Sequence, residues 1–344
     1  MKNLYVFFIF LAALTLNSTV FAMDQKYESE PKDKFTAKQS KPLKYTSSEY
    51  EYNVSNRWGA YVYASLIYWQ PREKDLELGE LSPTNTATDK FQIETLSTDF
   101  DLGFKVGIGA IFRDGWLLNA EYVRLHTSNS QKVTLPSWAS GFTDYWTTVV
   151  TDSEFYLCWK LDYDILTLDI SRSSYIGEWF IFQIIGGLKG GWIDQKINTY
   201  AIDSSNSNRF NADYKLNSWL IGPKVGFTTK FLLCETFRFF TNLNFSLLYQ
   251  DFNNKASIDR NDGSGSNTIA QDTSYIVPNI DTAIGFGWRK AFQNDAWIID
   301  LSASYDINYY FSQQQLRRLV TKEFASDIGA LALQGLTLTA KIEF

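Results

Sequence analysis

The chain has 344 residues, of which 17% are aromatic, with 32 Lys and Arg against 38 Asp and Glu. The acidic balance argues against nucleic acid as a partner. A mean hydropathy of −0.22 argues against a bundle of membrane-spanning helices, because each such helix needs about 20 consecutive apolar residues.

The N-terminus has the pattern of a secretory signal. Lys2 precedes an apolar run from Leu4 to Leu16, and small residues follow it. We therefore expect residues 1–22 to be a cleaved signal peptide, since the alternative, a membrane anchor, needs a longer apolar run. Residues 23–56 mix Lys with Asp and Glu and have almost no aliphatic side chains. They predict a flexible periplasmic segment, with peptidoglycan binding as the alternative.

From residue 57 onward, apolar and polar residues alternate with the period of a β-strand. The first strand, 58–69, has aromatic residues on both faces, so its phase is ambiguous. The alternation is clearest in six later runs: 100–112, 155–170, 236–250, 276–289, 297–309 and 336–344. In the run at 155–170 the apolar positions change from odd to even. We interpret this change as a β-bulge near 165–166, which would turn Asp162, Asp164 and Asp169 toward the same face.

The connections between the runs alternate in length. Short connections fall at 113–115, 173–178, 232–235 and 292–295, and long ones at 72–91, 128–153, 201–212, 251–272 and 314–327. Four short turns and five long loops join ten strands. An even strand number, short periplasmic turns and long external loops are typical of outer-membrane barrels. The sequence therefore predicts an all-β fold: an antiparallel transmembrane β-barrel of about ten strands (eight to twelve), over residues 57–344, with both termini on the periplasmic side.

Aromatic residues cluster at two heights on the apolar faces. The row near the short turns includes Trp116, Phe231, Phe237, Trp288, Trp297 and Phe344; the row toward the long loops includes Tyr122, Trp159, Trp192, Trp219 and Tyr249. About ten tilted residues separate the rows, which matches an apolar membrane band of about 25 Å. A soluble β-sandwich, the alternative, would concentrate Trp in its core. We therefore expect these side chains to form lipid-facing girdles.

Charged residues occupy the opposite, polar faces, and acids nearly balance bases. The expected lumen-lining residues are Lys105, Glu121, Asp162, Asp164, Asp169, Lys189, Lys224, Arg238, Asp281, Arg289, Asp300, Asp306 and Lys341. Two interpretations stay open. Opposed charged walls could orient solutes and tune ion selectivity, or salt bridges across the lumen could plug the barrel. Ten strands leave only a narrow channel.

Several stretches carry a resemblance to a known family. They lie at 63–79, 97–125, 161–175, 184–200 and 218–227, and the run from Gly190 to Gln195 is the most specific. In these stretches the chain resembles the major-outer-membrane-protein-like family of legionella and chlamydia-type bacteria. The resemblance implies an outer-membrane barrel with passive solute passage, sometimes with adhesion, and brings no catalytic residues. Chlamydial members are rich in cysteine, whereas this chain has 2.

The expected function is therefore porin-like diffusion of small solutes or ions through a narrow charged lumen. The alternative is a surface-exposed adhesin or structural barrel with a plugged lumen, which binds through its long loops. Expected partners are outer-membrane lipid, the barrel assembly machinery through the C-terminal strand 335–344, and further copies of the chain by analogy with porins.

No catalytic, cofactor-binding or metal-binding residues are expected. The lone histidine, His126, has no Asp-x-His pairing around it, so a general base would lack its orienting partner. An outer-membrane enzyme is thus disfavoured. Cys158 falls in a strand and Cys234 in a turn at the other end of the wall, so a disulfide between them is not expected.

Overall fold

The computed structural model describes residues 59–74, 76–84, 90–112, 115–146, 150–151, 154–202, 209–260, 265–292, 297–316, 319 and 329–344. The expected signal peptide and the charged segment 23–56 lie outside these residues. No helix among the described residues is long and apolar enough to cross a membrane.

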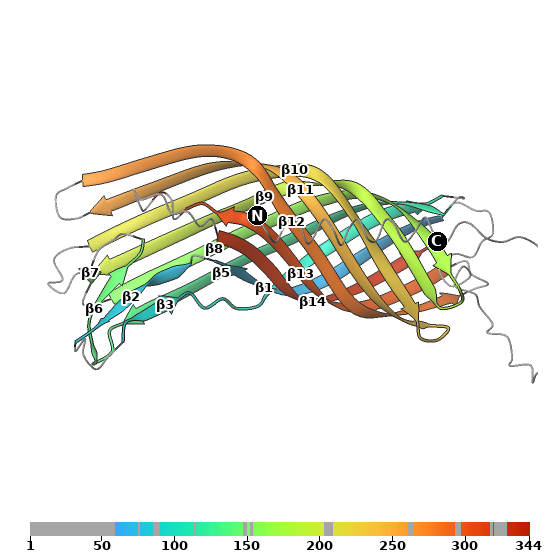
Figure 1. Cartoon of the computed structure of the whole chain (residues 1–344), viewed down its shortest axis with the longest axis horizontal. Helices are drawn as coiled ribbons and strands as arrows, with labels where there is room; N and C mark the ends of the chain where they lie inside the picture. Colours follow the sequence, from blue (N-terminus) through green and yellow to red (C-terminus); the bar gives the residue numbers. More distant parts are fainter. Residues whose placement is uncertain are drawn as a thin grey trace, which may run out of the picture. The chain divides into compact units, whose positions relative to one another are not determined.

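Ten antiparallel strands close into a barrel (Figure 1). In ring order they are β1 (Gly59–Glu73), β14 (Gly329–Glu343), β13 (Trp297–Gln314), β12 (Gly265–Phe292), β11 (Phe237–Arg260), β10 (Arg209–Leu232), β9 (Phe180–Ile202), β8 (Glu154–Ile176), β5 (Trp116–Thr134) and β4 (Asp101–Ile111). Because β1 pairs with both β14 and β4, the ring has no open edge. The predicted ten-stranded antiparallel barrel is confirmed.

Four shorter strands form a second sheet in the order β3 (Gln92–Thr95), β2 (Glu77–Pro83), β6 (Ala139–Asp144) and β7 (Val150–Thr151). β2 lies in the loop predicted at 72–91 and β3 directly follows that loop, while β6 and β7 lie in the loop predicted at 128–153. Phe142 of β6 packs on Phe155 of β8 with ring centroids 5.2 Å apart, and Trp146 packs on Tyr214 of β10 at 5.4 Å. The second sheet therefore packs against inward-facing side chains of the barrel.

The loop predicted at 251–272 is much shorter than expected. Strands β11 and β12 pair continuously as far as Arg260 and Gly265, so most of the predicted loop is strand. The turn-forming residues Asn261 to Ser264 fall outside the described residues. The polar composition that suggested a loop is the composition of strands whose outer faces meet water.

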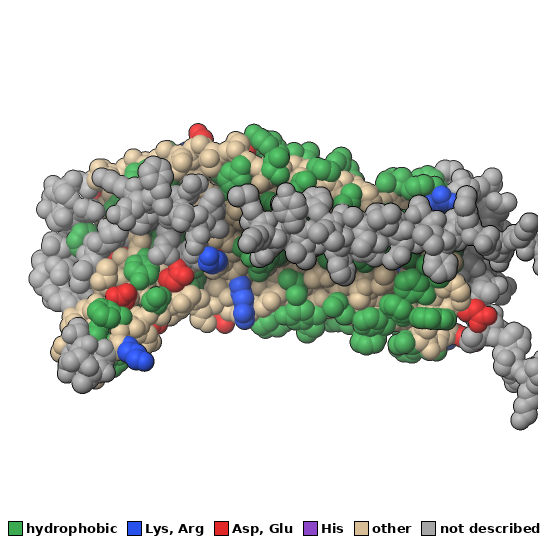
Figure 2. All heavy atoms as spheres, viewed as in Figure 1, with side chains coloured by type: hydrophobic (Ala, Val, Ile, Leu, Met, Phe, Trp, Pro, Cys, Tyr) green, Lys and Arg blue, Asp and Glu red, His purple; other side chains and the backbone are tan. Residues whose placement is uncertain are grey.

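The long strands exchange their apolar and polar faces partway along. In β10, the outward residues from Trp219 toward the short turn are apolar except for Thr229, as at Val225, while Lys224 points inward. Beyond Trp219 the order reverses, with Lys215 outward and Leu216 buried inside. In Figure 2 hydrophobic side chains accordingly gather over the right-hand part of the wall, on the short-turn side. Outward apolar residues suit lipid and outward polar residues suit water, so the strands leave the apolar band near Trp219.

Strand β8 shows the same exchange and corrects one prediction. Its pairing runs without a shift along its length against both β5 and β9, so no β-bulge exists at 165–166. Tyr163 and Ile165 face inward, whereas Leu166 and Leu168 face outward. The change of apolar parity marks the boundary between lipid and water around an unbroken strand.

The inner side chains of the long-loop half form a closed apolar cluster. Its fully buried members come from the barrel wall and from the second sheet. Among them are Ile67, Trp69, Leu78, Leu125, Phe142, Trp146, Leu157, Trp159, Leu161, Tyr163, Ile193, Tyr214, Leu216, Phe252, Tyr310 and Leu331. The ambiguous phase of the first strand is thus resolved, since its Ile67 and Trp69 point inward.

Candidate functional site

A polar cavity of about 360 Å³ occupies the lumen between the apolar cluster and the short turns. Trp69, Tyr163 and Ile165 of the apolar cluster border it. A second cavity of about 170 Å³ shares Tyr61 and other lining residues with the first and reaches the short-turn end of the strands. Two polar cavities therefore lie next to one another within the segment whose outer wall is apolar.

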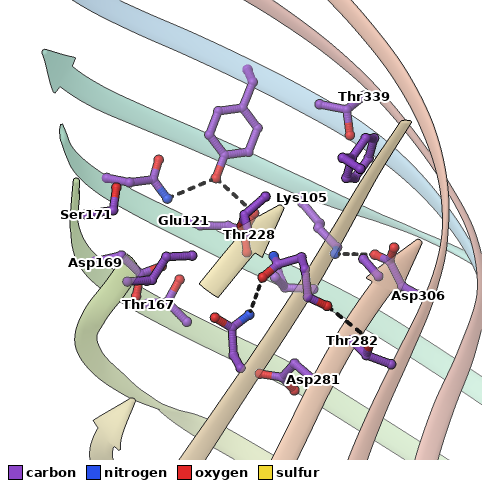
Figure 3. Close-up of a pocket in the computed structure, with 18 of the residues that line it drawn as sticks. Lys105, Glu121, Thr167, Asp169, Ser171, Thr228, Asp281, Thr282, Asp306 and Thr339 are labelled. Atoms are coloured by element: carbon purple, nitrogen blue, oxygen red, sulfur yellow. Dashed lines mark hydrogen bonds and ion pairs between the residues drawn. The ribbon is translucent and has the colours of Figure 1, made fainter. Parts of the chain in front are cut away.

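Ion pairs cross the middle of the lumen. Figure 3 shows Lys105 directed at Asp306, and their Nζ and Oδ2 atoms are 2.7 Å apart. Two further pairs, Lys189 with Asp281 and Lys224 with Asp169, each have an N–O distance of 2.8 Å. None of the three pairs joins neighbouring strands of the ring, so each one spans part of the interior.

Charged residues also meet at the short-turn end. Arg238 Nη2 lies 2.8 Å from Asp300 Oδ2. Glu343 accepts from two cations, with Arg289 Nη2 at 2.6 Å and Lys341 Nζ at 2.7 Å. Charge-assisted contacts of this length hold the side chains in fixed positions.

Two tyrosines of β1 lie flat across β4. Tyr63 OH donates to Glu121 Oε2 at 2.8 Å, and Tyr61 OH donates to Asn119 Oδ1 at 3.1 Å. The rings fit because β4 has glycine beneath Tyr63: a Cβ atom at Gly107 would lie 2.2 Å from Tyr63 Cζ. Gly107 therefore leaves the space in which the Tyr63 ring lies against β4.

The boundary between cavity and apolar cluster is built from aromatic rings with cations beneath them. Tyr163 OH and Tyr310 OH are hydrogen-bonded at 2.8 Å, and they come from β8 and β13. Lys189 Nζ lies 4.9 Å from the Tyr310 ring centroid, and Lys105 Nζ lies 4.6 Å from that of Trp69. Cation–π attraction stabilises the rings in this closed arrangement.

Most of the predicted lumen residues border these cavities. Those on the first cavity are Lys105, Glu121, Asp169, Lys189, Lys224, Arg238, Asp281, Asp306 and Lys341, and those on the second include Arg289 and Asp300. Asp162 and Asp164 do not line the lumen. They lie on the outer face of β8, where 56% of the Asp162 side chain is exposed. Their predicted direction is wrong because the strand continues without the β-bulge that was assumed to turn them inward.

The outward position of these carboxylates brings them to His126. His126 Nδ1 lies 3.3 Å from Asp162 Oδ1, and His126 Nε2 lies 3.5 Å from Asp164 Oδ2. The expectation that no acid would orient His126 is thus wrong, because the pairing comes from strand register and not from nearby sequence. The group lies on the outer surface, apart from both lumen cavities. Among the described residues, no set of three or more His, Cys, Asp or Glu could hold a metal ion.

The predicted girdle residues face outward, with one exception. The outward side chains are Trp116, Tyr122, Trp192, Trp219, Phe231, Phe237, Tyr249, Trp288, Trp297 and Phe344. Trp159 is fully buried inside the barrel, where its Nε1 donates to Gln195 Oε1 at 3.1 Å. It lies beyond the face exchange of β8, so its inward side is the apolar one.

Cys158 and Cys234 are both free thiols.

A closed barrel with an apolar outer band, aromatic rows and a charged lumen defines a transmembrane β-barrel, the class found in bacterial outer membranes. The chain belongs to the family described as Legionella pneumophila major outer membrane protein precursor, which matches residues 53–344. It is therefore a bacterial outer membrane protein, and the expected family resemblance is confirmed.

Solved structures of outer-membrane barrels are also similar. The outer membrane protease OmpT from Escherichia coli is 9% identical, with a TM-score of 0.42 over 83% of this chain and 96% of that one. The toluene transporter TodX from Pseudomonas putida is 10% identical, with a TM-score of 0.31 over 88% and 94%. The attachment invasion locus protein Ail of Yersinia pestis is 10% identical, with a TM-score of 0.22 over 83% and 98%. At these scores the likenesses carry no argument about function. No curated protein matches the sequence.

Proposed function

We propose that this protein is a porin-like barrel that passes small solutes or ions through its narrow charged lumen. The observation that supports the proposal is the pair of adjacent polar cavities inside the segment with the apolar outer wall. Ionisable side chains at membrane depth are costly, and they commonly mark solute pathways. The hydrogen-bonded pair Tyr163 and Tyr310 belongs to the boundary between the cavity and the apolar cluster, and a solute that passes must displace side chains of this cluster.

The proposal includes an orientation and three partners. Short turns of such barrels face the periplasm, so both termini would lie there and the long-loop end would face outside. The barrel assembly machinery would recognise the C-terminal strand, which leads to Phe344. Further copies of the chain would associate as in porins, with lipid around the apolar band. No catalytic activity is proposed.

A second candidate is a surface-binding barrel with a plugged lumen. It is favoured by the apolar cluster, which fills the long-loop half of the interior with fully buried side chains. The polar outer faces of β8 to β12 beyond the aromatic row would then support loops that bind partners outside the cell. Loop deletions that leave adhesion unchanged would count against this candidate.

Single-channel recording in planar bilayers separates the two. We expect small conductance steps from the refolded full chain and larger steps from Tyr163→Ala/Tyr310→Ala, because this change removes two rings from the boundary between the cavity and the apolar cluster. The outward pair Tyr249→Ala/Tyr305→Ala is the matched control and should conduct like the wild type. If neither the wild type nor the widened variant rises above leak, the channel proposal fails and the surface-binding candidate stands.

A further inference from the structure

The smaller cavity at the short-turn end has an unbalanced charge. Its cations are Lys230, Arg238, Arg289 and Lys341, and its acids are Asp300 and Glu343. Four basic side chains therefore face two carboxylates among the described lining residues. Both carboxylates already bind guanidinium or ammonium groups at 2.6 to 2.8 Å.

The lysines in the middle of the lumen are matched by acids. Lys105, Lys189 and Lys224 each pair with one carboxylate, and Glu121 adds a fourth acid. The remaining basic side chains of the larger cavity are Lys230, Arg238 and Lys341, which also line the smaller one. The excess of basic side chains therefore lies toward the short turns. The sequence had suggested opposed walls across the lumen, but the strand ends bring the excess cations together at one height.

The positive region also offers neutral groups that can donate hydrogen bonds. Gln183, Ser302, Thr339 and Tyr61 line the same cavity. Guanidinium forks and ammonium groups bind carboxylate and phosphate oxygens well, especially where little water screens them. A volume of about 170 Å³ equals the share of roughly five waters in the liquid, which is enough for a small anion and little more.

We infer that the short-turn end of the lumen is a binding site for small oxyanions, such as phosphate or a short carboxylate. The inference deepens the proposed function. It rests on that function in one respect, since it names small anions as the class of solute that the lumen would favour. It depends on the summed charge of the lining and not on the pairing of any single cation.

Binding of inorganic phosphate to the refolded full chain in detergent tests the site directly. Isothermal titration should show saturable binding to the wild type. Lys230→Gln/Lys341→Gln leaves two basic side chains against two carboxylates in the described lining, and we expect about tenfold weaker binding because two basic groups that can contact the anion are lost. Lys230→Arg/Lys341→Arg keeps the charges and should retain binding, provided that both variants show the heat-modifiable migration of a folded barrel.

The matched control replaces two lysines on the outer surface of the barrel. Lys215 and Lys255 are paired across β10 and β11 and are exposed beyond the outer aromatic row. Lys215→Gln/Lys255→Gln should bind phosphate like the wild type. The inference is overturned if the wild type does not bind phosphate, or if the lumen variant and the outer variant lose affinity equally.

Reversal potentials in a KCl gradient separate this inference from the proposed function. We expect the wild type to prefer chloride over potassium and the neutralised lumen variant to lose that preference. A channel that prefers cations would overturn the inference and leave the proposed function standing. A protein without conductance would overturn the proposed function, and phosphate titration would still decide the inference.

Discussion

Residue Lys189 illustrates why the lumen pairs hold the barrel in one arrangement. Its side chain is 3% exposed and that of Asp281 is 16% exposed, with Nζ also 2.9 Å from Asn279 Oδ1. A buried pair need not stabilise a fold relative to apolar residues, but the loss of one partner leaves the other charge uncompensated. The pairs therefore constrain which side chains can change alone.

We predict that Lys189→Met lowers the free energy of unfolding by about 3 kcal/mol. The double variant Lys189→Met/Asp281→Asn should recover part of this loss, because the unpaired charge is gone. Urea unfolding of the refolded protein measures both. The control is Lys132→Met, which breaks the exposed Lys132–Glu154 pair and should cost less than about 1 kcal/mol. Equal effects of the two single changes would contradict the prediction.

At Gly107 the prediction is steric. Gly107→Val would place Cβ within 2.2 Å of Tyr63 Cζ and force the ring off β4, which breaks the bond from Tyr63 OH to Glu121. We expect a less stable barrel, as strain and a lost hydrogen bond add together. The variant Gly107→Val/Tyr63→Ala should be more stable than Gly107→Val, as measured by the temperature of heat-modified migration. The idea fails if the second change gives no recovery.

In a long strand of this barrel, the apolar residues occupy either odd or even positions, depending on whether the outer face of the strand meets lipid or water. Strand β8 continues unbroken from the water-facing part at Tyr156 to the lipid-facing part at Leu168. A change of parity in one strand can therefore mean either a β-bulge or a change of solvent around a regular strand. Pairing with the neighbours decides between them, and sequence alone does not.

We predict that the same charge is tolerated at one end of β8 and not at the other. Leu168→Arg places a charge on the lipid face and should cost about 2–4 kcal/mol, with poor insertion into vesicles. Tyr156→Arg, also outward and 40% exposed, should insert like the wild type because its neighbourhood is aqueous. Insertion is scored by heat-modifiable migration after refolding. Equal tolerance at the two positions would move the proposed membrane boundary.

At the scale of the whole molecule, the two natural thiols report on orientation. Cys234 is exposed in the short turn between β10 and β11, and Cys158 lies near the long-loop end of β8. Backbone N–H groups of Thr236 and Phe237 donate hydrogen bonds to the sulfur and lower the pKa of Cys234. The lowered pKa raises the thiolate fraction above that of an unperturbed thiol at the same pH, so the thiol should react more readily where reagent can reach it.

We predict that a membrane-impermeant maleimide labels the Cys158→Ser variant only after the outer membrane is permeabilised. Labelling of Cys234 should also persist to lower pH than labelling of an unperturbed thiol, since the lowered pKa keeps more thiolate as the pH falls. The Cys234→Ser variant controls for reaction at Cys158. Labelling of Cys234 on intact cells would place the short turns outside and reverse the proposed orientation.

The sequence by itself determined the barrel. Alternation of period two, the order of short and long connections and the aromatic rows each depend on local composition, and ten strands in an antiparallel ring follow from them. Most lumen charges were identified for the same reason, because within the apolar band a polar residue on a strand can only face inward.

Only the tertiary structure decided what fills the lumen and where its charge lies. Strand register placed Asp162 beside His126, and ring closure brought Lys230 and Lys341 to one cavity from strands far apart in sequence. The second sheet and Trp159 pack inside the long-loop half of the barrel. In that half the faces of the strands are exchanged, so apolar residues point into the barrel and not toward lipid. Such contacts depend on which strands meet and at what height, and alternation within one strand carries no information about either.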